Sequence, residues 1–351
     1  TPSYIALNSN GTGPFKIESH QPGVKTVFKP NPTYWGKKEH NLDEIVFTPI
    51  SNDATRVAAL LSGEVDVIEP VPIQDIARVN ASDKARVLAG PELRTIFLGF
   101  DQIRDELLES NIKGKNPFKD VRVRQAFNMA IDKETIKARV MRGLSTPSPL
   151  MIAPELFAFS KDFQNPKFDA EGAKKLLAEA GYPNGFEVGM DCPNDRYVND
   201  GQICQAVVGM LARIGVKVNL NAQPKAQYFA KVLKAGGYKT SFYLLGWTPG
   251  TFDSHNVLFD ILGCRAEGTP RGESNLGGYC NKDVDALTDK IIVEADTAKR
   301  DQMIKQAFDI TVKEFAYVPL HQQALAWGVA KNVELVQRAD NQVLLYWANK
   351  K

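Results

Sequence analysis

Along most of this chain, segments with helical periodicity alternate with short apolar strands. The clearest helix is predicted over residues 203–214, where apolar side chains recur every three or four residues and form one stripe. Gly215 then predicts the helix end, and residues 216–220 alternate apolar and polar residues as a strand does. Because amphipathic helices bury their apolar stripes against sheets, this interleaving predicts an α/β fold.

Further apolar stripes are interpreted as helix faces that pack in the core and have no catalytic or binding role. They are predicted in helices that begin at Asn52 or Asp53, Asp120, Asp132 and Asp169, and in helices that include Phe229, Val284 and Met303.

Strand patterns concentrate towards the two ends of the chain. Strands are predicted at residues 13–17, 24–28, 42–47, 65–68, 95–100 and 242–245, and strand-like segments return from 318–320 to 344–347. A helix-rich middle between strand-rich ends suits two lobes, with a chain that crosses from one to the other and later returns.

The length and composition limit the classes of protein to consider. A chain of 351 residues corresponds to two or three domains of about 150 residues each. Charged residues make up 24% and hydrophobic residues 43%, which is ordinary for a globular protein. The net charge of +2 predicts no general attraction to nucleic acid or to anionic membranes. No segment approaches the roughly 18 apolar residues of a membrane span, so we expect a soluble multidomain protein.

The amino terminus, Thr1-Pro2-Ser3-Tyr4, has no Met, no basic region and no apolar region. It is interpreted as neither a natural start nor a signal peptide, and we expect that processing or deliberate truncation removed what came before. The compartment of the protein therefore cannot be inferred from a targeting segment.

Four cysteines fall into two close pairs, Cys192 with Cys204 and Cys264 with Cys280. An even number of cysteines so arranged suits two local disulfides in an oxidising compartment, and four reduced thiols are the alternative. Zinc fits less well, because the sequence has no C-x-x-C motif. The four histidines are also dispersed, at His20, His40, His255 and His321.

Motifs of known chemistry do not identify an activity. The sequence contains no G-x-S-x-G, no P-loop, no H-E-x-x-H and no EF-hand string. Residues 11–13 begin like a dinucleotide fingerprint, but the third glycine is missing and Pro14 follows at once. Paired carboxylates could be assembled in many ways, so they are not specific. We predict no catalytic residues, no cofactor and no metal.

A series of short phrases is more informative. They occur in this order: GTGPF at 11–15, NPTYWG at 31–36, ALLSGEVD at 59–66, NPFKDVRVRQA at 116–126, AIDK at 130–133, AKKLLAEAGYP at 173–183, MLARIGV at 210–216 and GW at 246–247. Together they resemble the family-5 extracellular solute-binding proteins, the peptide- and nickel-type receptors of bacterial ABC importers. The resemblance spans nearly the whole chain.

This resemblance implies a two-lobed, clamp-like periplasmic-binding-protein fold of type II. Residues 1–96 and 323–351 would belong to lobe I and residues 97–322 to lobe II. Crossings near residues 95–99 and 320–323 would form a hinge that lets the lobes close on a ligand. In the family, about the first third of the mature protein precedes the Gly-Thr-Gly-Pro phrase, so the resemblance also implies an N-terminally truncated chain.

The function implied by the resemblance is that of a non-catalytic receptor. It would capture a small peptide-like or carboxylate-bearing solute between its lobes and deliver it to the membrane permease of an ABC importer. We expect a monomer in the periplasm, or extracytoplasmic with a membrane anchor, that binds no nucleic acid. The alternatives are a solute-sensing receptor and a hydrolase built on a two-lobed scaffold.

Arg196 is the first ligand-binding candidate implied by the resemblance. In dipeptide-type members, this segment carries the arginine that holds the ligand carboxylate. A planar guanidinium suits that role because it forms two parallel charge-assisted hydrogen bonds. The alternative is a surface arginine paired with Asp195 or Asp200. Asn194 and Tyr197 lie in the same segment and are also predicted to bind the ligand.

Trp247 and Thr248 follow an apolar strand and would supply an aromatic wall and a hydroxyl group, with core packing of Trp247 as the alternative. In dipeptide-type relatives, the Trp-Thr pair is followed by Gly-Asp, and that Asp binds the ligand's ammonium group. Here Pro249 and Gly250 follow. Asp253 could substitute only if the loop folds back, and a shifted register is the alternative.

Burying an ammonium without an anionic partner is costly. The ligand is therefore predicted to be acidic or neutral, or to carry its amine elsewhere, and not to be an ordinary free dipeptide.

The resemblance also bears on the disulfides. Cys264 and Cys280 match a family bridge within the loop after the Gly-Trp phrase. A Cys192–Cys204 bridge would link the loop that holds Arg196 to the following helix and would order that loop before the ligand binds.

Overall fold

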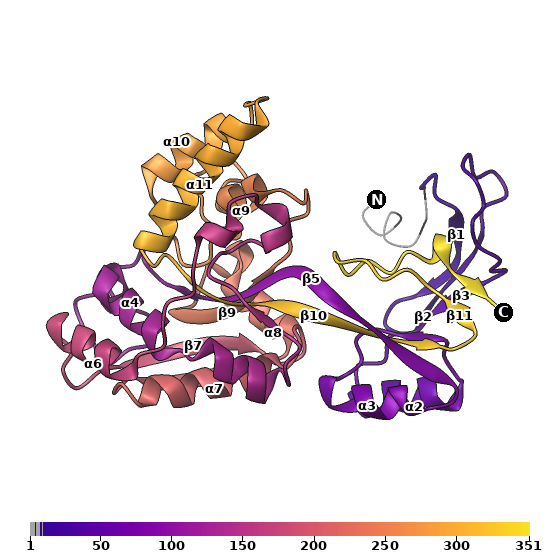
Figure 1. Ribbon diagram of the computed structural model, residues 1–351, viewed down its shortest axis with the longest axis horizontal. Helices are drawn as coiled ribbons and strands as arrows, with labels where there is room; N and C mark the ends of the chain where they lie inside the picture. Colours follow the sequence, from indigo (N-terminus) through magenta and orange to yellow (C-terminus); the bar gives the residue numbers. More distant parts are fainter. Residues whose placement is uncertain (1–3, 5–7, 9) are drawn as a thin grey trace. The chain divides into compact units, whose positions relative to one another are not determined.

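The computed structural model describes residues 4, 8 and 10–351, so Thr1, Pro2 and Ser3 of the amino terminus lie outside the described residues. The chain divides into two compact units, unit 1 with residues 1–92 and 324–351 and unit 2 with residues 93–323. Both boundaries fall inside long strands, β5 (Ala85–Phe100) and β10 (Val318–Ala330) (Figure 1). The lobe boundaries expected from the sequence lay between residues 96 and 97 and between residues 322 and 323. The two units differ from them at residues 93–96 and at Gln323, all of which lie in unit 2.

The described residues of unit 1 form small antiparallel sheets and short helices. The strands β1 (Phe15–Gln21), β2 (Lys25–Pro30) and β3 (Ile45–Phe47) form one sheet in that order. The short strand β4 (Val67–Ile68) pairs with the end of β10. A separate two-stranded sheet joins β11 (Val333–Glu334) to β12 (Asn349–Lys350). From residue 10 onwards, the α-helices of unit 1 are α2 (Asp53–Ser62) and α3 (Ile76–Asn80). The strands predicted at 42–47 and 65–68 are both shorter than expected.

Helix α2 shows how local sequence sets an element of unit 1. The Asn52 side chain accepts the backbone N–H of Thr55, which caps the first turn. Gly63 ends the helix with φ 88°, a left-handed conformation that glycine adopts without strain. The buried face of the helix contains Val57 and Leu60, which pack in one apolar cluster with residues of β4. The helix predicted from residues 52–53 is therefore confirmed.

Unit 2 is organised around one mixed sheet. Its strands follow the order β10-β5-β9-β7-β8, with the short β6 (Thr146–Pro147) on the other side of β10. The strand β9 (Phe242–Trp247) is antiparallel to β5, while β7 (Glu187–Pro193) is parallel to both β9 and β8 (Lys217–Gln223). In the β5–β9 register, Thr95 lies opposite Trp247. Because β7 and β9 are parallel, their carboxyl ends lie at the same edge of the sheet.

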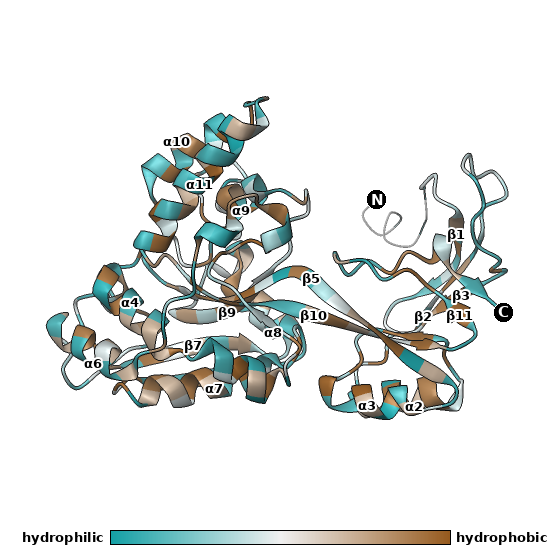
Figure 2. Cartoon of the chain, viewed as in Figure 1, coloured by the Kyte–Doolittle hydropathy of each residue, from teal (hydrophilic) through white to brown (hydrophobic). Residues whose placement is uncertain are grey.

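The helices of unit 2 are α4 (Val121–Ala130), α5 (Lys133–Thr135), α6 (Ala170–Glu179), α7 (Asp200–Ala212), α8 (Lys225–Val232), α9 (Ser254–Asp260), α10 (Lys282–Ile291) and α11 (Thr297–Lys313). The side chains of Asp120, Asp132 and Asp169 cap α4, α5 and α6 as predicted. Both α10 and α11 carry hydrophobic as well as hydrophilic residues (Figure 2), and the buried ones recur every three or four residues, as the predicted apolar stripes require.

Two segments differ from the sequence-based expectations. The helix predicted from Asp132 is α-helical only over α5 and continues as a π-helical turn, Ile136–Val140. The apolar run at 344–347, predicted as a strand, is a 3₁₀ turn over Leu345–Trp347. Among the described residues, no strand pairs with that run, and a strand without a hydrogen-bonded neighbour has no ladder to hold it.

Apolar packing in the core of unit 2 holds both ends of β9. Five phenylalanines pack on one another with ring centroids between 4.9 and 6.1 Å apart: Phe100, Phe118, Phe127, Phe186 and Phe242. All are buried, and fully burying one such ring stabilises a fold by about 1.5–3 kcal/mol. A larger apolar cluster packs against the other parts of β5 and β9. The phenylalanines thus hold the amino end of β9, and the larger cluster holds its carboxyl end through Leu245 and Trp247.

Candidate functional site

Unit 2 contains a pocket of about 280 Å³. Four of the six residues predicted to bind ligand line it, namely Arg196, Tyr197, Trp247 and Thr248. The other lining residues are Arg94, Phe229, Leu233, Leu245, Gly246, Ser274 and Leu276. In the described part of the chain, the residues that line this pocket include two arginines and no carboxylate.

The segment from 194 to 199, which we call the arginine loop, connects β7 to α7. The disulfide Cys192–Cys204 joins the end of β7 to α7 and closes this loop at its base. The backbone N–H of Val198 donates to Oε1 of Gln323 at 3.0 Å, and the Asn199 side chain donates to the carbonyl of Val140 at 2.9 Å. The backbone of the arginine loop is thus held from several sides.

Asp200 holds the arginine loop from within. One of its carboxylate oxygens accepts the backbone N–H groups of Arg196 and Tyr197, each at 2.9 Å, and the other accepts that of Gly201. The side chain is buried, and burial raises the pKa of Asp200 although the three backbone hydrogen bonds oppose that rise. These bonds fix the backbone from which the side chains of residues 196 and 197 enter the pocket lining.

Tyr197 links the arginine loop to β9. Its hydroxyl donates to the carbonyl of Gly246 at 3.4 Å. Burial raises the pKa of this phenol, against the opposing positive charge of Arg196, so the hydroxyl stays protonated at neutral pH. A Cβ atom at Gly246 would lie 2.7 Å from the Tyr197 ring and 2.8 Å from Ile96. The glycine of the Gly-Trp phrase is therefore needed for the ring to lie against the strand.

Arg196 itself is exposed and its guanidinium carbon lies 5.0 Å from the centre of the Tyr197 ring. Within the described chain, no ion pair joins Arg196 to Asp195 or Asp200, the partners considered for a purely structural role. Asp195 instead accepts the backbone N–H of Lys225. The guanidinium is thus placed at the pocket with hydrogen-bonding capacity for an anion.

Trp247 forms a wall of the pocket and also packs against the apolar core of unit 2. Its indole N–H donates to Oδ1 of Asn256 at 2.8 Å, and Asn256 in turn donates to Asp260 at 2.5 Å. The hydroxyl of Thr248 is buried and has no hydrogen-bond partner among the described residues. A buried hydroxyl without a partner is costly, so Thr248 offers an unused polar contact at the pocket.

Asp253 and Asn194 do not line the pocket. Asp253 caps α9 by accepting the backbone N–H of His255 at 2.7 Å, and it pairs with Arg300 at 2.8 Å. Burial acts to raise the pKa of Asp253, but the bond from Arg300 and the cap outweigh it, so the pKa lies below its ordinary value. Asn194 is exposed, and its backbone N–H bonds to the carbonyl of Gln223.

A second loop, residues 265–279, also contributes to the pocket, and we call it the asparagine loop. The disulfide Cys264–Cys280 closes it, so both cysteine pairs named in the sequence analysis are bonded. Ser274 and Leu276 of this loop line the pocket on either side of the fully buried Asn275.

Sequence reasoning missed several lining residues, among them Arg94 and the apolar residues of α8 and the asparagine loop. Arg94 stands just before the strand predicted at 95–100, and nothing in that pattern indicates a site. Only the register that places Thr95 opposite Trp247 brings Arg94 to this pocket.

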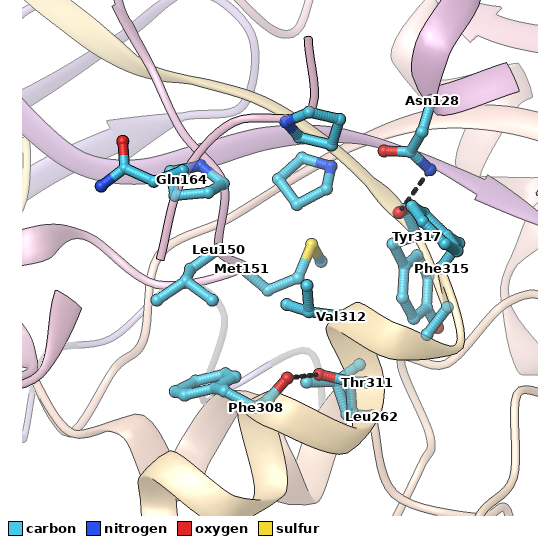
Figure 3. A pocket seen from close by; sticks show the side chains of 14 residues that line it. Asn128, Leu150, Met151, Gln164, Leu262, Phe308, Thr311, Val312, Phe315 and Tyr317 are labelled. Carbon is cyan, nitrogen blue, oxygen red and sulfur yellow. Dashed lines mark hydrogen bonds between the residues drawn. The ribbon is translucent and has the colours of Figure 1, made fainter. Parts of the chain in front are cut away.

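A second cavity lies elsewhere in unit 2, among Leu150, Met151, Leu262, Phe308 and Val312 (Figure 3). Its volume of about 30 Å³ matches one water molecule and is too small for a solute. The polar side chains at its rim are satisfied: Figure 3 shows Asn128 bonded to the Tyr317 carbonyl and Thr311 bonded to the Phe308 carbonyl. We interpret it as a packing void.

Two further features of the described residues bear on other functions. They contain no group of three or more His, Cys, Asp or Glu side chains arranged to hold a metal ion. None of the helices they form is both long enough and apolar enough to span a membrane.

Comparison with known proteins identifies relatives of the chain. The sequence profile of the bacterial extracellular solute-binding proteins, family 5 Middle, matches residues 1–269. Heme-binding protein A of Haemophilus influenzae is 29% identical over 318 residues, which cover 88% of this chain and 54% of that protein. Glutathione-binding protein GsiB of Salmonella typhimurium is 27% identical over 332 residues, covering 94% of this chain and 62% of that protein. The chain thus spans little more than half the length of these curated relatives.

A solved structure also resembles this one. The PBP AgaA from A. tumefaciens R10, in complex with agropinic acid, superposes with a TM-score of 0.80 at 26% identity, covering 98% of this chain and 67% of AgaA. This likeness confirms the periplasmic-binding-protein fold that the sequence predicted.

Proposed function

Because the chain belongs to the bacterial extracellular solute-binding proteins of family 5, we propose that it is the substrate-binding receptor of an ABC importer. In this proposal the two units are the two lobes of the receptor, and the partner is a membrane permease that accepts the bound solute. The receptor is a monomer and performs no catalysis. Two disulfides support a periplasmic or other extracytoplasmic location, because such bonds persist in oxidising compartments.

The main structural support for this proposal is the pocket of unit 2. It combines the arginine of the arginine loop with an indole wall, a buried hydroxyl without a partner and apolar side chains. Ligand sites of small solutes have this composition, with apolar walls and a few polar groups that fix orientation. The arginine supports a carboxylate-bearing ligand, and the relatives' names include a glutathione-binding protein and a complex with agropinic acid.

The first test is the affinity of an Arg196→Ala variant. A thermal-shift screen with a small-metabolite library would identify a ligand, and calorimetry would then compare the two proteins. We expect the variant to lose about 2–4 kcal/mol of binding free energy, as when one partner of a buried charge pair is removed. An Arg213→Ala variant, which removes an exposed arginine outside the pocket, should bind like the original. Equal affinity of the Arg196 variant would rule out the role of Arg196.

The ligand itself should be recovered unchanged after binding. Mass spectrometry of the released ligand distinguishes a receptor from a hydrolase, and turnover would contradict the proposal. Uptake by vesicles that contain the permease would distinguish transport from solute sensing.

Trp247 provides an optical test of the pocket. Its indole lines the pocket and is held by Asn256, so a bound solute should change its fluorescence. We expect a Trp247→Phe variant to lose the tryptophan response to ligand. An intact response in the variant would show that Trp247 does not sense the ligand.

The absence of a carboxylate in the lining of the described pocket also restricts the ligand. Asp253 is engaged by Arg300 and by the cap of α9, which supports a ligand without an ammonium group in this pocket. Titration with a mixed dipeptide library tests this. Micromolar binding that disappears when the peptides are N-acetylated would contradict it.

A further inference from the structure

The strand β9 separates the pocket lining into two chemically different parts. Side chains alternate between the faces of a strand, so Leu245 and Trp247 share one face of β9 and position 246 belongs to the other. A Cβ atom at Gly246 would lie 2.7 Å from the Tyr197 ring, which therefore packs on that other face, beside Arg196. The apolar side chains and the arginine thus reach the pocket from opposite faces of the strand.

Helix α8 and the asparagine loop extend the apolar part. Tyr228 of α8 is fully buried and its hydroxyl donates to the carbonyl of Leu244 at 2.7 Å, which holds the helix beside β9. Phe229 is the next residue, and Leu233 follows four residues later, directly after the end of the helix. The apolar lining residues, which we call the apolar wall, are Phe229, Leu233, Leu245, Trp247 and Leu276.

The indole of Trp247 presents ring surface and no free polar atom to the pocket. Its N–H is donated to Asn256, which in turn donates to Asp260. An indole has no other hydrogen-bonding atom. The part of the solute that lies against Trp247 is therefore expected to be hydrocarbon or an aromatic ring.

Leu233 is the member of the apolar wall that is most open to a ligand. It is 37% exposed, whereas Leu245 is 5% exposed and Leu276 is fully buried. An apolar group that covers Leu233 would gain free energy in proportion to the apolar area removed from water. The pocket volume of about 280 Å³ lies near the lower end of the range of about 300–1,000 Å³ for small-molecule sites, which suits a small solute.

We propose that the apolar wall is a second subsite of this pocket and that the solute is an amphipathic acid. Its carboxylate binds Arg196, and an aliphatic or aromatic group packs against Leu233 and the Trp247 ring. A purely polar solute would lose hydration at the apolar wall without a hydrogen bond in return. This inference rests on the proposed receptor function and goes beyond it by assigning the subsite that distinguishes apolar from polar acids.

The test uses N-acetylated amino acids, each with one carboxylate and no ammonium group. N-acetyl-leucine is compared with N-acetyl-asparagine, and N-acetyl-methionine with N-acetyl-glutamine, because the side chains of each pair are similar in size and differ in polarity. Calorimetry at several temperatures measures their binding to the full chain and to its Leu233→Asn and Leu108→Asn variants. Leu108 is 49% exposed and lies outside the pocket, so the second variant is the matched control.

We expect the protein to bind at least one apolar probe about 10-fold to 100-fold more tightly than its polar counterpart, the range for burial of one apolar side chain. The binding enthalpy of that probe should become more negative as the temperature rises, because burial of apolar surface lowers the heat capacity. Leu233→Asn should reduce the preference by about 3-fold to 10-fold and leave the affinity for the polar probe within about 2-fold. Leu108→Asn should bind like the original protein.

Different results overturn the inference and the receptor function. Equal affinity for apolar and polar probes, or a preference that Leu233→Asn leaves unchanged, overturns the inference and leaves the receptor function standing. If no probe binds, a ligand from the library screen replaces them: weaker binding in Leu233→Asn but not in Leu108→Asn supports the inference, and equal binding in both overturns it alone. If no probe and no library compound binds, both fail together. Thermal unfolding of each variant, measured alongside, shows that the differences arise in the folded protein.

Discussion

The arginine loop and the asparagine loop are both closed by a disulfide and both line the pocket, but they are held in different ways. The asparagine loop is filled by its own side chains. Asn275 is fully buried, and its amide donates to the carbonyls of Gly263 and Tyr279 while its oxygen accepts the hydroxyl of Tyr317. The loop therefore wraps around an internal polar group that has every partner it needs.

Arg265 reinforces this arrangement from the other end of the asparagine loop. It donates to the carbonyls of Asn275 and Leu276, and its guanidinium carbon lies 3.7 Å from the centre of the Tyr238 ring. Burial lowers the pKa of Arg265, although neighbouring tyrosines oppose that effect. The guanidinium of this arginine is occupied by the protein itself.

In the arginine loop the arrangement is reversed. Asp200 and the disulfide hold the backbone, and the side chain of Arg196 is left exposed at the pocket. A loop can therefore be stabilised in two ways. Its polar side chains can form hydrogen bonds to its own carbonyl groups, or its backbone can be held by a neighbouring side chain and a disulfide. Only the second way leaves a guanidinium for a ligand.

The largest expected effect is that of Asn275→Ala. Loss of three buried hydrogen bonds at about 1–1.5 kcal/mol each should lower the free energy of unfolding by about 4 kcal/mol. Asn194→Ala, at an exposed site in the arginine loop, should change it by less than about 0.5 kcal/mol. Urea unfolding measures both, and equal effects of the two changes would contradict the difference between the loops.

Removal of each disulfide should have the next largest effect. Closing a loop of this size stabilises a protein by about 3 kcal/mol in the loop-closure model, so Cys192→Ser with Cys204→Ser and Cys264→Ser with Cys280→Ser should destabilise similarly. Ligand affinity should distinguish them, because only the first pair closes the loop that carries Arg196. Calorimetry on both double variants tests this. A greater loss of affinity in the Cys264/Cys280 variant would show that the asparagine loop matters more for binding.

The smallest expected effect concerns Asp200. Asp200→Ala leaves three backbone N–H groups without this partner and should lower the free energy of unfolding by about 2 kcal/mol near neutral pH. It should also weaken ligand binding, because the arginine loop loses its support. Asp283→Ala, which removes an exposed carboxylate in the first turn of α10, is the matched control.

The pH dependence of the same residue gives an independent check. Burial raises the pKa of Asp200 above its ordinary value of 3.8, so the folded protein holds this proton at a pH where the unfolded chain has lost it. The stability that Asp200 adds relative to Asp200→Asn is therefore greatest below pH 3.8 and declines as the pH rises through the folded pKa. Urea unfolding of both proteins across this range measures the difference, and a difference that grows with pH would contradict the assignment.

Part of the fold follows from neighbouring residues in the sequence. Asp120 and Asp169 cap their helices as predicted, because a cap depends on a side chain and an N–H group two or three residues away. The helix predicted over 203–214 appears as α7, which starts slightly earlier because Asp200 stands at its first turn. The strand predicted at 344–347 is wrong, since an apolar run does not show whether another strand pairs with it.

Of the residues that line the pocket, Arg196 and Trp247 could be named in advance, because the family resemblance of the sequence implied them. That Arg94 also lines the pocket, and that Asp253 does not, follows only from the three-dimensional structure. Arg94 reaches the pocket through the β5–β9 register, and Asp253 is engaged by Arg300 from a helix much later in the chain. Both facts depend on pairings between distant segments. Such pairings are set by packing of the whole unit, and no local pattern of residues encodes them.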